Sequence, residues 1–185
     1  MINVGEIRKG VGIELDGKIF RVLEYSHIKM GRGGAQARLK LLDLRSGAIF
    51  DRTFSASERF ARIRVDRHPV QFLYSDGDFY HFMDTQNFEQ RAVPGAILGD
   101  AVNYLKDELQ LELSYYGEEP IGVELPLNVV LRVEETDPGF KGDTATGGTK
   151  PARTETGLMV NVPLFVTTGD LIRVDTRSGG YIERA

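Results

Sequence analysis

The sequence predicts an all-β protein divided into three small β units. Runs of strand-forming residues alternate with tight, glycine-containing turns, and only one short stretch has helical spacing. Breaks near Ile63 and Pro126 give the segments 1–63, 64–126 and 127–185. Each segment has its own strands and turns, which is typical of several small barrels in a row.

The first segment is expected to form hairpins. The pair Asp16-Gly17 separates two strand-like runs and predicts a two-residue turn. Further strands are expected over residues 20–28 and 36–44. The stretch Ser55-Ala56-Ser57-Glu58 has the form of a capping box, so it predicts a short helical turn near the end of the segment.

The second segment has the pattern of an oligonucleotide-binding (OB) barrel. The runs 70–74 and 79–83 flank a turn with the sequence Ser-Asp-Gly-Asp, which is a strong hairpin signature. Apolar residues recur at helical spacing over 102–109 and predict one short helix, which is followed by a strand over 111–116. Many strands with one short helix favour this kind of barrel.

The third segment contains the least regular stretch of the chain, residues 137–151, before strands return at 160–166, 171–174 and 181–184. Long irregular loops in compact domains are usually functional or disordered. This one is rich in Gly and Thr, whose backbone N–H groups and hydroxyls can hydrogen-bond phosphate, sugar or base edges. The loop is therefore a candidate for contact with nucleic acid.

Arg32 stands alone between Gly31 on one side and Gly33 and Gly34 on the other, where one predicted strand ends and the next begins. Glycine permits the positive φ angles of a tight tip and removes bulk around the guanidinium, which could then enter a narrow crevice of RNA. The same pattern occurs in ordinary turns, where an arginine only keeps the turn soluble. The local sequence leaves both interpretations open.

Charge is distributed unevenly along the chain. Segment 1–63 has 12 Lys and Arg against 7 Asp and Glu, whereas segment 64–126 has 4 against 12, and segment 127–185 has 7 against 8. Contact with a polyanion is therefore expected in the first segment. The acidic second segment would repel phosphate and could face basic protein surfaces instead.

Several kinds of function have little support in the sequence. Cysteine is absent, which excludes disulfides and thiolate metal sites. The residues His27, His68 and His81 lack metal-ligand spacing, and neighbouring carboxylates lie at predicted turns. No signal peptide or membrane-spanning run is present, so we expect a cytoplasmic protein. Because no catalytic or metal-binding motif is found, we also expect that the protein is not an enzyme and needs no metal or cofactor.

An ordered set of motifs resembles bacterial elongation factor P along the whole chain. The set includes the glycine-flanked tip at residue 32, Tyr74-Ser75-Asp76-Gly77, Lys141-Gly142-Asp143-Thr144 and Val162-Pro163-Leu164-Phe165-Val166. The resemblance implies three small β-barrels in an L shape, with an N-terminal KOW-like barrel followed by two OB-folds. Members of this family bind the ribosome between the peptidyl and exit sites and relieve stalling at consecutive prolines.

The resemblance also implies roles for individual residues. Arg32, shaped by its flanking glycines, would contact the acceptor end of the peptidyl-tRNA and could carry a modification such as rhamnose, but not the lysine-type extension. The loop residues Gly142, Asp143 and Thr144 would contact the mRNA in the exit site. Tyr181 and Arg184 match positions that touch the peptidyl-tRNA.

The implied partners are rRNA and ribosomal proteins, peptidyl-tRNA, mRNA and an arginine-modifying enzyme, for a monomer that needs no membrane. Where relatives commonly read Lys-Pro-Ala-Thr-Leu, this chain has Arg153 and Thr154, which could weaken packing or add an RNA contact. Two alternatives remain: an elongation-factor-P-like paralog, which usually lacks the Gly-Asp-Thr loop, and a general single-strand RNA-binding barrel protein.

Overall fold

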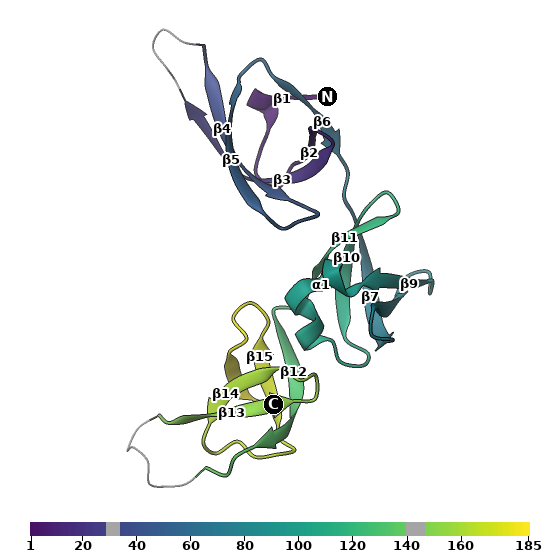
Figure 1. Ribbon diagram of the computed structural model, residues 1–185, viewed down its shortest axis with the longest axis vertical. Helices are drawn as coiled ribbons and strands as arrows, with labels where there is room; N and C mark the ends of the chain where they lie inside the picture. The colour runs from purple at the N-terminus through teal and green to yellow at the C-terminus, as the bar shows by residue number, and fades with distance from the viewer. Residues whose placement is uncertain (29–33, 140–146) are drawn as a thin grey trace. The chain divides into compact units, whose positions relative to one another are not determined.

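The computed structural model describes residues 1–28, 34–139 and 147–185, and the chain is almost entirely β-structure in these ranges (Figure 1). The predicted all-β class is confirmed. Two compact units form, one from Met1–Arg67 with Ser114–Gly122 and the other from His68–Leu113 with Val123–Ala185. The segment boundaries inferred from the sequence and the L-shaped arrangement of the barrels stay predictions.

The N-terminal sheet has six antiparallel strands in the order β1-β6-β2-β3-β4-β5. A 3-10 helix, Val4–Glu6, follows the first strand. The strands are β1 (Ile2–Asn3), β2 (Gly12–Leu15), β3 (Lys18–Ile28), β4 (Gln36–Asp43), β5 (Ile49–Ser55) and β6 (Arg59–Ile63). Asp16 and Gly17, with φ of 52° and 73°, form the predicted hairpin turn between β2 and β3.

The predicted helical turn near Ser55 is wrong, and only one of the two hydrogen bonds of a capping box forms, the one from the Ser55 backbone N–H to the Glu58 side chain. The Ser55 backbone N–H donates to Oε2 of Glu58 at 3.3 Å, and the Glu58 N–H donates to the Ser55 carbonyl at 3.0 Å. These bonds close a tight turn after β5, because the following residues of β6 pair with β2, with Ile13 opposite Arg62. Long-range strand pairing thus overrides the local capping signal.

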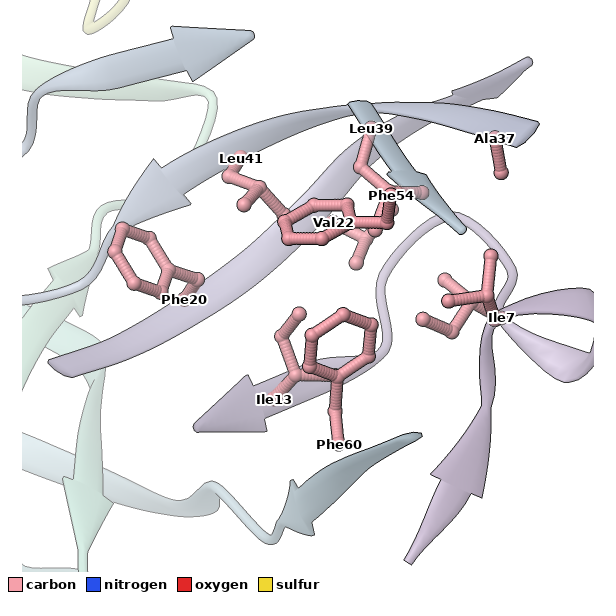
Figure 2. Close-up of a cluster of buried hydrophobic side chains, with 10 residues drawn as sticks. Ile7, Ile13, Phe20, Val22, Ala37, Leu39, Leu41, Phe54 and Phe60 are labelled. Carbon is pink, nitrogen blue, oxygen red and sulfur yellow. The ribbon is translucent and has the colours of Figure 1, made fainter. Parts of the chain in front are cut away.

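The core of this barrel is built by alternation along its strands. Ala37, Leu39 and Leu41 occupy every second position of β4, and all three are fully buried. Phe54 and Phe60 meet edge to face at 4.9 Å beneath them (Figure 2). Burial of each large apolar side chain contributes about 1.5–3 kcal/mol, so this cluster holds the strands in register.

A second buried cluster in the first unit joins strands that are distant in sequence. Its buried members are Ile19, Ile63 and Ile121. Arg45 closes the same region with a two-pronged ion pair, Nε to Oε1 and Nη2 to Oε2 of Glu119, at 2.9 and 3.0 Å. This hydrogen bond is the main cause that lowers the pKa of Glu119 below its usual value.

Two five-stranded antiparallel sheets complete the fold, in the orders β11-β10-β7-β8-β9 and β14-β13-β12-β15-β16. The first comprises β7 (Asp66–Ser75), β8 (Phe79–Asp84), β9 (Gln90–Pro94), β10 (Gln110–Tyr116) and β11 (Glu119–Glu124). The second comprises β12 (Asn128–Thr136), β13 (Thr149–Thr154), β14 (Met159–Pro163), β15 (Leu171–Asp175) and β16 (Tyr181–Arg184).

The predicted short helix exists, but it starts and ends earlier than the apolar spacing over 102–109 suggests. It consists of α1 (Gly95–Leu98) and a 3-10 helix, Gly99–Tyr104. Leu109 lies beyond it, after Glu108 with a φ of 64°, and its carbonyl accepts a hydrogen bond from Phe72 of β7. The apolar spacing therefore reflects burial in a turn and a strand edge, not a continuous helix.

Candidate nucleic-acid interface

A long two-stranded ribbon, β3 with β4, leads to the predicted tip. The tip residues Arg32, Gly31 and Gly33 lie outside the described residues. The last described pair of the ribbon is Ile28 with Gln36, and β3 is 11 residues long. Because β4 is anchored by its buried alternate residues, the core fixes the direction in which the ribbon leaves the barrel.

Gly34, the last predicted tip glycine, is described and exposed. A Cβ at this position would have no atom within 4 Å, and its φ lies outside the left-handed region. Neither backbone strain nor a close contact therefore requires glycine here. The remaining reason for glycine at position 34 is that it places no side chain near Arg32 in the sequence.

The outer face of the ribbon carries mixed charge. Lys40 lies 3.6 Å from Glu24, and Arg38 lies 3.5 Å from Asp51. These ion pairs are exposed and contribute little to stability. They do compensate the positive charge of Arg38 and Lys40 on this part of the ribbon.

The second predicted contact, the loop with Gly142, Asp143 and Thr144, also lies outside the described residues, but its base is described. Lys150 is only 6% exposed, and its Nζ donates a hydrogen bond to the carbonyl of Asp137 at 2.5 Å. A buried ammonium thus ties the strand after the loop to the residues before it.

Leu164 packs against both sides of this loop base. A Cβ on Gly139 would lie 2.3 Å from the Leu164 carbonyl oxygen, and one on Gly148 would lie 3.1 Å from its Cδ1. Only glycine at position 139 avoids a clash with backbone. The start and the end of the loop are therefore held against the same residue.

Tyr181 and Arg184, the predicted tRNA contacts, are both described on β16. Tyr181 pairs with Val174 and Arg184 pairs with Ile172, with a bulge between the two pairs. Val174 and Ile172 are two residues apart on β15, so they share one face of the sheet. Residues three apart on a regular strand would face opposite sides, and the bulge therefore brings Tyr181 and Arg184 to the same face.

Arg184 is partly neutralised by a carboxylate of its own barrel. Its Nη1 lies 3.6 Å from Oδ2 of Asp170, while its side chain stays 57% exposed. The pKa of Asp170 is lowered, mainly by the hydrogen bond from the Thr167 backbone N–H and also by the charge of Arg184. The guanidinium keeps donors that face solvent and could bind phosphate.

The two unusual residues of the third segment have distinct environments. Arg153 pairs with Glu134 at 3.7 Å and Glu135 at 3.2 Å. Thr154 is fully buried, and its hydroxyl donates to the Leu158 carbonyl at 3.1 Å. The substitution therefore leaves the local packing satisfied, and Arg153 is engaged with carboxylates rather than free for RNA.

Two of the three histidines, His68 and His81, make structural contacts within the described ranges. The His81 ring stacks on Tyr74 at 4.4 Å and hydrogen-bonds Asp76 at 2.8 Å. His68 lies 3.2 Å from the buried Asp84. Across the described parts of the chain, no group of three or more His, Cys, Asp or Glu could hold a metal ion, and no helix could cross a membrane.

Cations gather in one place where the sequence pattern does not predict a cluster. Around Gly12, residues distant in sequence line one cleft of about 690 Å³, which we call the basic cleft. Its charged members are Lys9, Arg21, Arg62, Arg64 and Arg67. The sequence predicts positive charge only for the first segment as a whole, because the grouping of these cations depends on strand register.

Small antiparallel β-sheets in series, with almost no helix, define the class of multi-domain proteins built from small β-barrels. Three models of one family match the chain in order. They are the elongation factor P KOW-like domain over residues 3–60, its OB domain over 65–123 and its C-terminal domain over 129–184. The chain belongs to the elongation factor P family.

Individual relatives agree with this assignment. Elongation factor P of Moorella thermoacetica is 51% identical over 185 residues, and that of Pelotomaculum thermopropionicum is 47% identical over 184, with both chains covered completely in each case. The solved structure of translation initiation factor 5A from Methanococcus jannaschii has a TM-score of 0.51 at 23% identity, covering 66% of this chain and 94% of that one. The solved structure of a translation initiation factor eIF-5A family protein from Naegleria fowleri has a TM-score of 0.51 at 16% identity, covering 67% of this chain and 96% of that one. At these identities the solved structures establish the fold alone.

Proposed function

We propose that this protein binds the ribosome between the peptidyl and exit sites and stimulates peptide-bond formation between consecutive prolines. The main support is the match to the elongation factor P family along the whole chain, with Arg32 between the two strands of the anchored β3–β4 ribbon. The partners would be rRNA, ribosomal proteins, peptidyl-tRNA and mRNA. The protein would act as a cytoplasmic monomer.

Arg32 would act by orientation rather than by bond chemistry. Its planar guanidinium can donate two parallel hydrogen bonds to phosphate or ribose at the acceptor end of the peptidyl-tRNA. Prolyl substrates react slowly, and holding the reacting groups in a productive geometry can accelerate such a step by orders of magnitude. No catalytic residue is needed for this role, so we propose that the protein is not an enzyme.

The other contacts would set the position of the whole factor. Gly142, Asp143 and Thr144 would touch the mRNA in the exit site, and the clamp of Lys150 on Asp137 supports the base of their loop. Tyr181 and Arg184 would touch the peptidyl-tRNA from the face of β16 that they share. The presence of Gly142-Asp143-Thr144 favours a true elongation factor P over the paralog.

The proposal is tested by the rate of Pro-Pro bond formation on purified ribosomes with and without the recombinant protein. We expect acceleration by the wild type and loss of about tenfold or more of it in Arg32→Ala, since misplaced substrates react far more slowly. Arg32→Lys is the control that keeps the charge but loses the fork of donors. Equal acceleration by wild type and Arg32→Ala would contradict the role of the tip.

A modification of Arg32 would alter this result in a defined way. If only protein purified from its native host accelerates the reaction, an arginine-modifying enzyme is a required partner, and mass spectrometry of the peptide containing Arg32 should show added mass. A general RNA-binding barrel would instead bind free RNA tightly and leave Pro-Pro synthesis unchanged.

A further inference from the structure

The basic cleft lies on the first unit, away in sequence from every residue to which we assigned a role above. It has a volume of about 690 Å³ and contains five cations. Among the residues that the structure describes, no Asp or Glu lines it. A concave surface with cations of one sign focuses a positive potential, which attracts anions.

Strand register brings the residues of the cleft together. Gly12 of β2 pairs with Arg21 of β3 on one side and with Ile63 of β6 on the other. A Cβ on Gly12 would lie 2.6 Å from Cγ1 of Ile63, so the glycine makes room for the Ile63 side chain. Arg21, Arg62 and Lys9 reach the cleft from neighbouring chain segments.

Three of the cations have no partner among the residues that the structure describes. Arg64 forms an ion pair with Asp66 at 2.7 Å. Lys9, Arg21 and Arg62, by contrast, have no carboxylate within ion-pair distance in the described ranges. Cations that repel one another in a concave site are stabilised when an anion binds between them.

Two other arginines on the same barrel are paired. Arg38 lies 3.5 Å from Asp51, and Arg52 lies 3.2 Å from Asp16. Arg21 and Arg62 differ from these two because they have no carboxylate within ion-pair distance among the described residues. This difference also supplies a control, because each pair of arginines carries the same charge.

We propose that the basic cleft binds closely spaced phosphates, and that its ligand is the sugar-phosphate backbone of RNA. The choice of RNA rests on the proposed function, in which the partners are ribosomal. Arginine forks match phosphate oxygens geometrically. No aromatic side chain lines the cleft, so bases have no stacking partner there and the contact is independent of sequence. The cleft is a second RNA contact, separate from the tip at Arg32.

The test uses the full chain, labelled with ¹⁵N, and two probes: a short RNA hairpin of mixed sequence and inorganic tripolyphosphate. Amide shifts of Gly10, Gly12 and Val65 report occupancy of the cleft. We expect both probes to shift these amides, with the hairpin binding more tightly at equal phosphate concentration. The double variant Arg21→Gln/Arg62→Gln is compared with the matched variant Arg38→Gln/Arg52→Gln.

We expect the cleft variant to bind the hairpin about fivefold or more weakly, and its slope of log affinity against log salt to fall by about 1.4–1.8, the value for two lost phosphate contacts. The matched variant should change the affinity less than about twofold and keep the slope. Spectra of each variant with dispersion like that of the wild type establish that the variant is folded.

Three results would overturn the proposal. If the hairpin leaves the cleft amides unshifted, the cleft does not bind RNA. If the two double variants lose equal affinity for the hairpin, the binding comes from the overall positive charge of the barrel and not from the cleft. Shifts with tripolyphosphate but not with the hairpin would replace RNA by a free polyphosphate as the ligand. Because the titration needs no ribosome, failure of Pro-Pro stimulation alone would contradict the proposed function and leave the cleft intact.

Discussion

Tyr181 and Arg184 lie on the same face of β16 although they are three residues apart. Tyr181 pairs with Val174 and Arg184 with Ile172, and the bulge between these pairs absorbs the extra residue. A regular strand would point them to opposite sides. One bound molecule can therefore touch both side chains, which is the geometry that the proposed tRNA contact needs.

We expect Arg184→Gln and Tyr181→Phe each to reduce the stimulation of Pro-Pro synthesis severalfold, and the double variant to lose less than the product of the two effects. Such coupling is expected for side chains that touch one ligand. The measurement is the dependence of the rate on factor concentration. Arg153→Gln is the matched control, because it removes one paired cation from the same barrel. Independent effects, or an equal loss in the control, would contradict a shared ligand.

Asp175 is predicted to titrate far below an ordinary aspartate. The side chain of Arg177 lowers its pKa most, followed by the backbone N–H groups of Arg177 and Ser178, and together they bring it to about 2. Because the folded pKa lies below the unfolded value, the stabilisation is present above pH 3.8 and is lost as pH falls through the folded pKa.

The check is a carboxyl ¹³C titration of the folded protein by NMR. Arg177→Gln should raise the Asp175 pKa but leave it below 3.8, because the two backbone donors remain. In parallel, Asp175→Asn should lower the unfolding free energy near neutral pH, and the difference from wild type should shrink below pH 3.8. A wild-type pKa near 3.8 would contradict the turn geometry.

Much of the fold was accessible from the sequence because the signals were local. The hairpin at Asp16-Gly17 requires positive φ at two successive residues, and this dipeptide has a strong preference for that turn. The strands 70–74 and 79–83 were predicted within a few residues of the observed β7 and β8 for the same reason. Alternation and turn chemistry are readable one segment at a time.

The failures arose where distant residues decide the local structure. Ser55 and Glu58 make one of the two hydrogen bonds of a capping box, yet pairing of β6 with β2 draws the following residues into a strand. The bulge at β16 and the basic cleft around Gly12 also depend on register between strands. Of the candidate site, the positions of Tyr181 and Arg184 on one strand could be predicted, but their common face could not.

Gly12→Ala is expected to destabilise the first unit. The added Cβ would lie 2.6 Å from Cγ1 of Ile63 and 3.3 Å from its carbonyl oxygen, so a buried side chain and a strand must shift. Overpacking of this kind costs about 1–3 kcal/mol of unfolding free energy, measured by urea denaturation. Gly122→Ala is the control, because a Cβ there meets no atom within 4 Å. Equal stability of the two variants would show that the β2–β6 contact adapts freely.

Lys150→Met is expected to loosen the base of the loop that contains Gly142, Asp143 and Thr144. Lys150 is 6% exposed and donates a hydrogen bond to the Asp137 carbonyl. Methionine keeps the length of the side chain but leaves that carbonyl without its donor, which costs about 1–3 kcal/mol of unfolding free energy. Hydrogen exchange should accelerate at the pairs between β12 and β13 that flank the loop, such as Thr136 with Ala152.

The functional consequence separates a role in positioning from a role in stability alone. If the clamp orients the loop, Lys150→Met should require a higher factor concentration for Pro-Pro stimulation, at a temperature where the variant is fully folded. Lys18→Met, at an exposed position of β3, should change both stability and stimulation little. If the variant is less stable but stimulates at the same factor concentration as the wild type, Lys150 contributes to stability alone. The loop would then keep its contact without the ammonium at its base.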